Sequence, residues 1–218
     1  MRRYILTDAG NVLTRFNLRS KLIAEIMAGF GVLELDLKRI FRTDLSINKE
    51  DCYHYLDTGE LSLRDLWEQL ITENGISENI CSYPLFISLW CRHLAPIEEV
   101  IKLYRKLQEN FSLVVVSNGD AEGVRHIIYH LIGKYGLRFE EIFISSERGR
   151  KKPELFNDVL EFLHSRKVNP ADCVFVDDLD QYVMAASNLG IPAICFDASK
   201  QDVSDLETAL AKLGFVAP

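Results

Sequence analysis

Four groups that could take part in one reaction each follow an apolar run along the chain. They are a carboxylate, a hydroxyl, an ammonium and a pair of carboxylates: Asp8, Ser117, Lys152 and Asp177–Asp178. Each preceding run has the length and composition of a buried β-strand. In a parallel α/β sheet the carboxyl ends of the strands meet at one edge, and ligands bind there. The sequence therefore predicts that these groups, far apart along the chain, come together at that edge.

Each of these groups has a role in the transfer of a phosphoryl group. A carboxylate such as Asp8 can attack phosphorus and form an aspartyl-phosphate. Asp177 or Asp178 beside Asp8 would bind Mg²⁺, which takes one or two carboxylates together with water and phosphate oxygens. Lys152 would offset the phosphate charge. The Ser117 hydroxyl and the backbone N–H groups of its turn would hold phosphate oxygens.

Each group also has an ordinary structural explanation when it is taken alone. Asp8 and Ser117 could be turn residues. Lys152 lies in a run of basic residues and could belong to a solvated loop, and Asp177–Asp178 could cap the following helix. The structural explanation needs four separate coincidences at successive strand ends, so the combination favours a catalytic site.

The elements that would position these groups alternate between strand and helix patterns. The apolar runs that predict strands are 4–6, 111–116, 141–145, 173–176 and 192–196. Amphipathic helix patterns with short connections separate the later strands. This alternation predicts a doubly wound α/β fold, with a parallel sheet, right-handed crossovers and helices on both faces, as in a Rossmann-like core.

The ends of four of these helices carry recognisable signals. Pro96 and Pro153 are predicted to open helices, since proline suits the first helical turn. Gly133 is predicted to stop the helix that begins near Glu122. Ser204 and Glu207 are predicted to form the capping box of the last helix.

Between the first and second strands the pattern is helical throughout. Ser62, with an acid three residues later, is predicted to cap one of these helices. The predicted helices cover 21–30, 36–41, 48–56, 63–73 and 83–94. The sequence therefore predicts a Rossmann-like core over 1–15 and 94–218, with an all-helical domain inserted over 16–93.

The order Asp…Ser…Lys-Pro…Asp-Asp resembles the four motifs of the haloacid dehalogenase (HAD) superfamily, and the resemblance covers nearly the whole chain. Members of this superfamily are mostly Mg²⁺-dependent phosphatases that work through an aspartyl-phosphate. The resemblance implies that Asp8 is the nucleophile and a metal ligand, and that the Gly10 carbonyl is a second ligand. It implies that Ser117 and Asn118 contact the phosphate, and that Lys152 bridges the nucleophile and the phosphate. It also implies that Asp178 binds the metal, with Asp177 beside it or one water away.

The resemblance also gives the inserted helices a role. Helical inserts at this place form a cap over the active site in the superfamily, and segment 57–62 is similar to one common in helical-cap members. Closure of a cap excludes water and strengthens charge interactions inside. Arg15, Phe16 and Asn17, at the entry to the insert, are candidates for selecting the substrate, with ordinary linker residues as the alternative.

The chain departs from the typical phosphatase pattern at Gly10. Typical phosphatases of the family carry a second aspartate there, which protonates the leaving oxygen and later activates water. The text Asp8-Ala-Gly-Asn-Val is similar to that of a subgroup that includes sugar-1-phosphate phosphatases. A positioned acid or base is worth about 10²–10⁴-fold in rate. We therefore expect slow turnover, or a leaving group that needs little protonation, such as an anomeric, aryl or acyl phosphate.

Composition agrees with a small cytoplasmic enzyme, a monomer or homodimer acting on a small phosphorylated substrate. The net charge of −7 argues against general nucleic-acid binding. The first apolar run is too short for a signal peptide, and no run is long enough to span a bilayer. Five cysteines without Cys-x-x-Cys spacing fit a reduced compartment.

Three other functions share some of these residues. A metal-independent 2-haloacid dehalogenase would use the same aspartate nucleophile and helical cap, but such enzymes carry an aromatic residue where Gly10 stands. A signalling receiver also combines acids, a hydroxyl and a lysine, but its acidic pair precedes the phosphorylated aspartate. A catalytically weak phosphate-binding or phosphoacceptor protein is the third alternative, and the joint presence of Asp8, Ser117, Lys152 and Asp178 argues against it.

Overall fold

The computed structural model describes residues 3–16, 49–73, 75–92 and 94–217. Its centre is a five-stranded parallel sheet with the order β5-β4-β1-β6-β7. The strands are β1 (Tyr4–Thr7), β4 (Ser112–Ser117), β5 (Phe139–Ile144), β6 (Cys173–Asp177) and β7 (Ala193–Cys195). The first strand of the chain therefore lies in the middle of the sheet, as in doubly wound folds. The predicted α/β fold class is confirmed.

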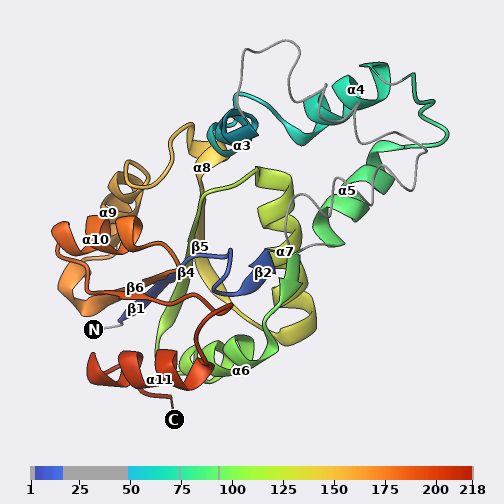
Figure 1. Cartoon of the computed structure of the whole chain (residues 1–218). Helices are drawn as coiled ribbons and strands as arrows, with labels where there is room; N and C mark the ends of the chain where they lie inside the picture. Colours follow the sequence, from blue (N-terminus) through green and yellow to red (C-terminus); the bar gives the residue numbers. More distant parts are fainter. Residues whose placement is uncertain (1–2, 17–48, 74, 93, 218) are drawn as a thin grey trace.

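Helices cover both faces of this sheet (Figure 1). Within β1, Ile5 packs with α6 (Glu98–Leu107), α7 (Ala121–Tyr135) and α11 (Val203–Lys212) in one apolar cluster. Leu6 packs in a second cluster with α9 (Phe156–Ser165) and α10 (Asp180–Asn188). Because successive strand residues point to opposite faces and both faces are covered, the central strands are apolar at nearly every position. This explains why the strands appear in the sequence as continuous apolar runs.

Two short helices complete the connections on the core. They are α8 (Ser145–Arg148), which directly follows β5, and the 3₁₀-helix η1 (Pro170–Asp172) before β6. Asn169 caps η1, since its side chain accepts a hydrogen bond from the Ala171 backbone N–H. Because all five strands run parallel, their carboxyl ends lie at the same edge of the sheet, and so do the polar residues that follow them.

Three described helices separate the first and second strands of the sheet, and they lie away from it (Figure 1). They are α3 (Lys49–Thr58), α4 (Leu63–Glu73) and α5 (Tyr83–Arg92), and they share an apolar cluster that includes Leu56, Trp67 and Phe86. Where the chain leaves and re-enters the core, β2 (Thr14–Phe16) pairs antiparallel with β3 (Leu94–Pro96). The division into a core over 1–15 and 94–218 and an insert over 16–93 stays a prediction. The helices predicted over 21–30 and 36–41 lie outside the described residues.

The cap predicted at Ser62 is present. Its backbone N–H and hydroxyl donate to Asp65 Oδ2 at 2.9 and 2.6 Å, and its hydroxyl accepts from the Asp65 N–H at 3.1 Å. The reciprocal bonds satisfy donors that the first turn of α4 would otherwise leave unpaired.

Two of the predicted helix starts are wrong. Pro96 belongs to β3 opposite Thr14, and α6 begins at Glu98. Pro153 lies in a turn, where its carbonyl accepts from the Phe156 N–H at 3.0 Å, and α9 begins at Phe156. A proline with a fixed φ suits a turn as well as a first helical residue, so its presence did not decide between them.

The predicted ends of two other helices are displaced along the chain. Helix α7 continues through Gly133 to Tyr135, whose ring packs on the core, and ends at Gly136 in the left-handed conformation with φ 70°. The capping box of α11 is formed by Asp202 and Asp205, two residues before the predicted pair. No described helix of the chain is both long enough and apolar enough to cross a lipid bilayer.

Candidate active site

The polar ends of the strands surround one cavity of about 550 Å³. It opens at the carboxyl ends of β1, β4 and β6, which is the edge where ligands bind in open α/β sheets. All seven residues predicted for the site line this cavity: Asp8, Gly10, Ser117, Asn118, Lys152, Asp177 and Asp178. The structure therefore brings Asp8 together with groups that lie more than a hundred positions later in the sequence.

Lys152 connects the two central strand ends. Its Nζ lies 3.0 Å from Asp8 Oδ1 and 2.5 Å from Asp177 Oδ2, and its side chain is 1 % exposed. The backbone also holds the Asp177 side chain, because its Oδ1 accepts a hydrogen bond from the Leu179 N–H at 2.9 Å. The ammonium group is thus held directly beside the carboxylate that was predicted to be the nucleophile.

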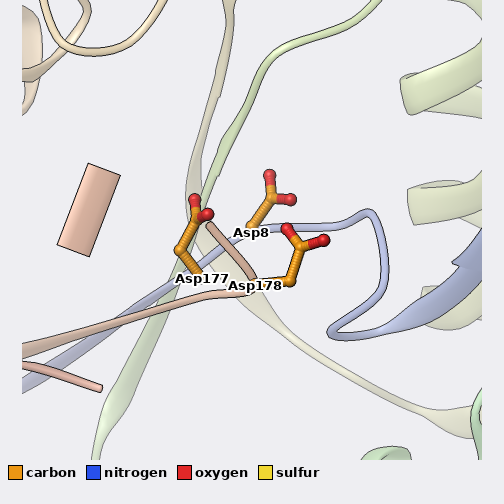
Figure 2. A group of neighbouring side chains, drawn as sticks. All are labelled: Asp8, Asp177 and Asp178. Carbon is orange, nitrogen blue, oxygen red and sulfur yellow. The ribbon is translucent and has the colours of Figure 1, made fainter. Parts of the chain in front are cut away.

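Asp178 completes a group of three carboxylates. Asp8, Asp177 and Asp178 each place one oxygen within 4.8 Å of the others, and Figure 2 shows them where β1 and β6 end. The Asn11 side chain donates to Asp178 Oδ2 at 2.9 Å, and Asn11 has a positive φ of 52°. The turn after β1 therefore positions a residue that orients a carboxylate from β6.

The charges in this group do not balance. Burial alone would lower the pKa of Lys152, but Asp8 and Asp177 raise it above its ordinary value, so the ammonium stays protonated. Burial, and next the negative charge of Asp8, raises the pKa of Asp177. Burial also raises the pKa of Asp178, against the effect of its hydrogen bond from Asn11. Three carboxylates share one ammonium, so the site carries an excess of negative charge.

This donor set fits a small divalent cation. Mg²⁺ prefers carboxylate and carbonyl oxygens, keeps several waters, and would neutralise the excess charge. Asp8 and Asp178, with the Gly10 carbonyl in the same turn, are the residues that would hold it, and Asp177 is engaged by Lys152. Among the described residues, no other group of three or more acidic, histidine or cysteine side chains is arranged for a metal ion.

The second strand end forms a network around Asn118. Its Oδ1 accepts from the Lys152 backbone N–H at 2.9 Å, and its Nδ2 donates to the Tyr182 hydroxyl at 3.0 Å. The next backbone N–H, that of Gly119, donates to Ser145 Oγ at 3.0 Å. The two Asn118 bonds connect the turn after β4 to the loop that carries Lys152 and to α10. Ser117 is nearly buried at the base of this turn.

A buried hydroxyl chain supports the backbone of Asp8. The Tyr104 hydroxyl donates to Thr7 Oγ1 at 3.1 Å, and Thr7 Oγ1 donates to the Asp8 carbonyl at 2.9 Å. The Asp8 backbone N–H donates to the Val176 carbonyl at 2.9 Å. Since both backbone groups are paired, the direction of the Asp8 side chain is set by the packed strands.

Gly10 lies beside the Asp8 side chain. A Cβ built on Gly10 would lie 3.6 Å from Asp8 Oδ2, with no other atom of the described residues beyond its chain neighbours within 4 Å, and its φ is not in the left-handed region. A side chain at this position would therefore lie next to the Asp8 carboxylate without a steric clash. Glycine leaves that space open.

Some residues of the site are not apparent in the sequence pattern. Asn11, Asp57, Trp90, Asp120 and Tyr182 all line the cavity. Asp57 and Trp90 come from the inserted helices α3 and α5, so no strand-end pattern could identify them. Tyr182 lies in the first turn of α10, directly after Asp177–Asp178. Its closeness in sequence to these two residues could have identified it as a site residue.

The residues proposed for the entry to the insert are placed differently. Arg15 lies in β2, is exposed, and is not among the residues that line the cavity. Its neighbour Thr14 and the opposite strand residue Leu94 do line it. Asn17 and the side chain of Phe16 lie outside the described residues.

Comparisons with solved structures agree with this architecture. A predicted HAD-like family hydrolase from Porphyromonas gingivalis has a TM-score of 0.69 at 20% identity, over 96% of this chain and 98% of that one. A HAD family enzyme from Bacteroides thetaiotaomicron, in complex with magnesium and inorganic phosphate, has a TM-score of 0.67 at 20% identity, over 94% and 99%. A 2-haloacid dehalogenase from Pseudomonas syringae pv. Tomato DC3000 has 0.63 at 21%, over 97% and 99%. At these identities the likeness shows the fold.

The sequence itself is also matched at the level of a family. A search of curated proteins gives no match. The model of the haloacid dehalogenase-like hydrolases matches residues 3–190, which include all four strand-end motifs and the helices α3, α4 and α5. The chain is therefore a hydrolase that belongs to the haloacid dehalogenase-like family.

Proposed function

We propose that this protein is a Mg²⁺-dependent phosphatase that hydrolyses a small phosphorylated metabolite through an aspartyl-phosphate on Asp8. The observation that carries the proposal is the ammonium of Lys152 between Asp8 and Asp177, with Asp178 in the same carboxylate group. An ammonium can bind one substrate phosphate oxygen while it holds the adjacent carboxylate in place for attack on phosphorus. The excess of negative charge requires a cation before an anionic phosphate can approach.

The reaction consists of two displacements at phosphorus. An Asp8 carboxylate oxygen attacks phosphorus, the bond to the leaving oxygen breaks, and that oxygen takes the bonding electrons. Water then attacks the aspartyl-phosphate, releases inorganic phosphate, and restores the Asp8 carboxylate. Protons for the leaving oxygen and from the water exchange with solvent, since Gly10 carries no acid. Mg²⁺, when bound, would offset charge on the phosphate oxygens.

The remaining residues hold the phosphoryl group in place. Ser117 and Asn118 line the same cavity as Lys152. They would donate to phosphate oxygens, and the network of Asn118 with Lys152 and Tyr182 would keep these donors in position. The HAD family enzyme from B. thetaiotaomicron, which was crystallised with magnesium and phosphate, supports this use of the fold.

A 2-haloacid dehalogenase is the second candidate, because several of the similar solved structures carry that name. The group of three carboxylates with a single ammonium favours the phosphatase, since a metal-independent displacement of halide gives no role to the excess negative charge. The open space at Gly10 also differs from the aromatic residue expected of a dehalogenase. The proposed inserted cap, made of the helices α3, α4 and α5, is common to both candidates.

Removal of the metal ion is expected to abolish hydrolysis of p-nitrophenyl phosphate, and added Mg²⁺ is expected to restore it. The physical reason is that the carboxylate group repels a phosphate dianion unless a cation neutralises it. The measurement is the initial rate after treatment with EDTA and after titration with MgCl₂. Full activity in EDTA would contradict the metal requirement, and halide release from 2-chloropropionate without metal would instead support the dehalogenase.

Substitution of the open position is expected to increase activity. Gly10→Asp should raise the hydrolysis rate of a simple alkyl phosphate by about 10²-fold, since a carboxyl group beside Asp8 can protonate a poor leaving oxygen. The rate with p-nitrophenyl phosphate should change little, because p-nitrophenolate leaves without protonation. Gly10→Asn is the matched control, with the same shape but no acidic proton. An equal gain in both variants would contradict the explanation.

A further inference from the structure

Part of the cavity is formed by residues outside the strand ends. We call this part the insert-side wall and define it as Leu56, Asp57, Trp90, Asp120 and Val124. Leu56 and Asp57 come from α3, Trp90 comes from α5, and the other two come from the start of α7. Since this wall shares a cavity with Asp8, it borders the space that is left for the part of a substrate beyond its phosphate.

Asp120 is the best-fixed polar group of this wall. Its Oδ1 accepts from the Gly123 backbone N–H at 2.6 Å, and its Oδ2 accepts from Trp90 Nε1 at 3.3 Å. Both donors are uncharged. In the described part of the chain, Asp120 has no ion pair with a lysine, arginine or histidine. Each carboxylate oxygen can accept a further hydrogen bond.

The wall is electrically negative. Burial raises the pKa of Asp120 to about 6, and the nearby charges of Asp57 and Glu122 contribute to the rise. Asp57 has an ion pair with Lys151 at 3.2 Å. Lys152 is the sole basic side chain among the described residues that line the cavity, and its ammonium is engaged by the carboxylates of the reaction centre. Asp120 therefore lines the cavity as a carboxylate, and among the described lining residues no basic side chain is left to bind an anion.

We propose that the leaving group of the substrate binds at the insert-side wall, and that it carries hydrogen-bond donors, either hydroxyls or an ammonium, and no anionic group. This inference rests on the proposed phosphatase function. A donor would bind an acceptor position of Asp120 that its two uncharged donors leave open, and would offset the charge of this carboxylate. The aliphatic side of such a group would pack on the Trp90 ring.

The size and charge of the space support this choice of substrate class. A cavity of about 550 Å³ falls in the range of small-molecule sites and has room for a group larger than phosphate alone. A leaving group with a carboxylate or a second phosphate would have its negative charge next to Asp120, which has no ion pair among the described residues. That repulsion would exclude such substrates.

Three esters with alkyl leaving groups test the inference: glycerol 1-phosphate, phosphoethanolamine and phosphoglycolate. Each is assayed as a competitive inhibitor of p-nitrophenyl phosphate hydrolysis, which does not require the ester itself to turn over. We expect the wild-type protein to bind the hydroxyl and ammonium esters at least about tenfold more tightly than the carboxylate ester. A thermal-shift titration of the Mg²⁺-loaded protein with the same esters gives a second comparison without turnover.

Asp120→Asn is the informative variant. Asparagine caps a helix as well as aspartate does, so α7 should keep its start. We expect the ratio of affinities between phosphoethanolamine and phosphoglycolate to fall about tenfold in this variant. Glu122→Gln is the matched control, since Glu122 is close to Asp120 but exposed and absent from the cavity lining.

Two outcomes would overturn the inference. One is phosphoglycolate binding to the wild-type protein as tightly as the other two esters. The other is an equal change of the affinity ratio in Asp120→Asn and Glu122→Gln. That result would indicate an effect of overall negative charge and not a contact between the ligand and Asp120. Loss of Mg²⁺-dependent hydrolysis in the wild-type protein would instead count against the proposed phosphatase, so the two failures are distinguishable.

Discussion

Asp8→Asn is expected to lower the turnover number for p-nitrophenyl phosphate by about 10⁴-fold or more, which is the scale seen when a nucleophile is removed. An amide cannot form the aspartyl-phosphate, because its nitrogen and oxygen are poor nucleophiles toward phosphorus. The fold should persist, since asparagine has the same shape and its oxygen can still accept from Lys152 Nζ. Phosphate release and the urea unfolding midpoint measure the two effects separately.

A matched substitution shows whether the loss is specific to the reaction. Asp202→Asn changes the same residue type at the N-terminus of α11, far from the cavity, and asparagine is an equally good cap. It should keep wild-type turnover. In the wild-type protein, acid quenching during turnover should yield a phosphorylated peptide that contains Asp8, and Asp8→Asn should yield none. Substantial turnover by Asp8→Asn would exclude the covalent route.

The strand ends could be read from the sequence because a parallel sheet has a simple geometry. Each strand is buried on both faces, so its apolar run ends where the chain reaches the ligand-binding edge. Asp8, Ser117 and Asp177 follow such runs directly, and they line one cavity. The order of strands around β1 then places Asp8 between the second and fourth motifs without any further information.

Contacts between side chains of different elements could not be read in this way. The bond from Asn118 to Tyr182 depends on the angle at which α10 leaves the sheet, and the bond from Asn11 to Asp178 depends on a turn with positive φ. The electrostatic effect of Asp57 on Asp120 depends on how α3 packs on the core, where it contacts α8. How inserted helices pack on the core depends on the shape complementarity of the two surfaces. This complementarity produces no periodic pattern of apolar residues in the sequence.

Helix ends were predicted less well than helices because competing signals lie close together. Asp202 and Ser204 are both good caps, and the earlier one forms the reciprocal pair with Asp205. Gly133 could end a helix, but Tyr135 packs on the core and extends α7 to Gly136. In each case tertiary packing decided between two locally acceptable ends.

Lys152→Met is expected to lower the free energy of unfolding of the metal-free protein by about 3–5 kcal/mol, the usual consequence of removing one partner from a buried ion pair. Lys152 is buried, and it is the ammonium that two buried carboxylates share. Methionine would fill the space beside the rings of Phe175 and Tyr182, so the loss should come from charge. Urea unfolding in EDTA measures it. Turnover should fall by about 10²–10³-fold, as when one donor to a transition state is removed.

Two companion variants identify the cause of that loss. Lys151→Met removes the neighbouring lysine, whose ion pair with Asp57 is partly exposed, and should cost about 1 kcal/mol or less. Adding Asp177→Asn to Lys152→Met removes the uncompensated buried charge and should restore most of the stability without restoring turnover. If the double variant is as unstable as Lys152→Met alone, the lysine acts through packing. The ammonium would then have no role in balancing the carboxylates, and the charge argument for a cation at this site would lose its basis.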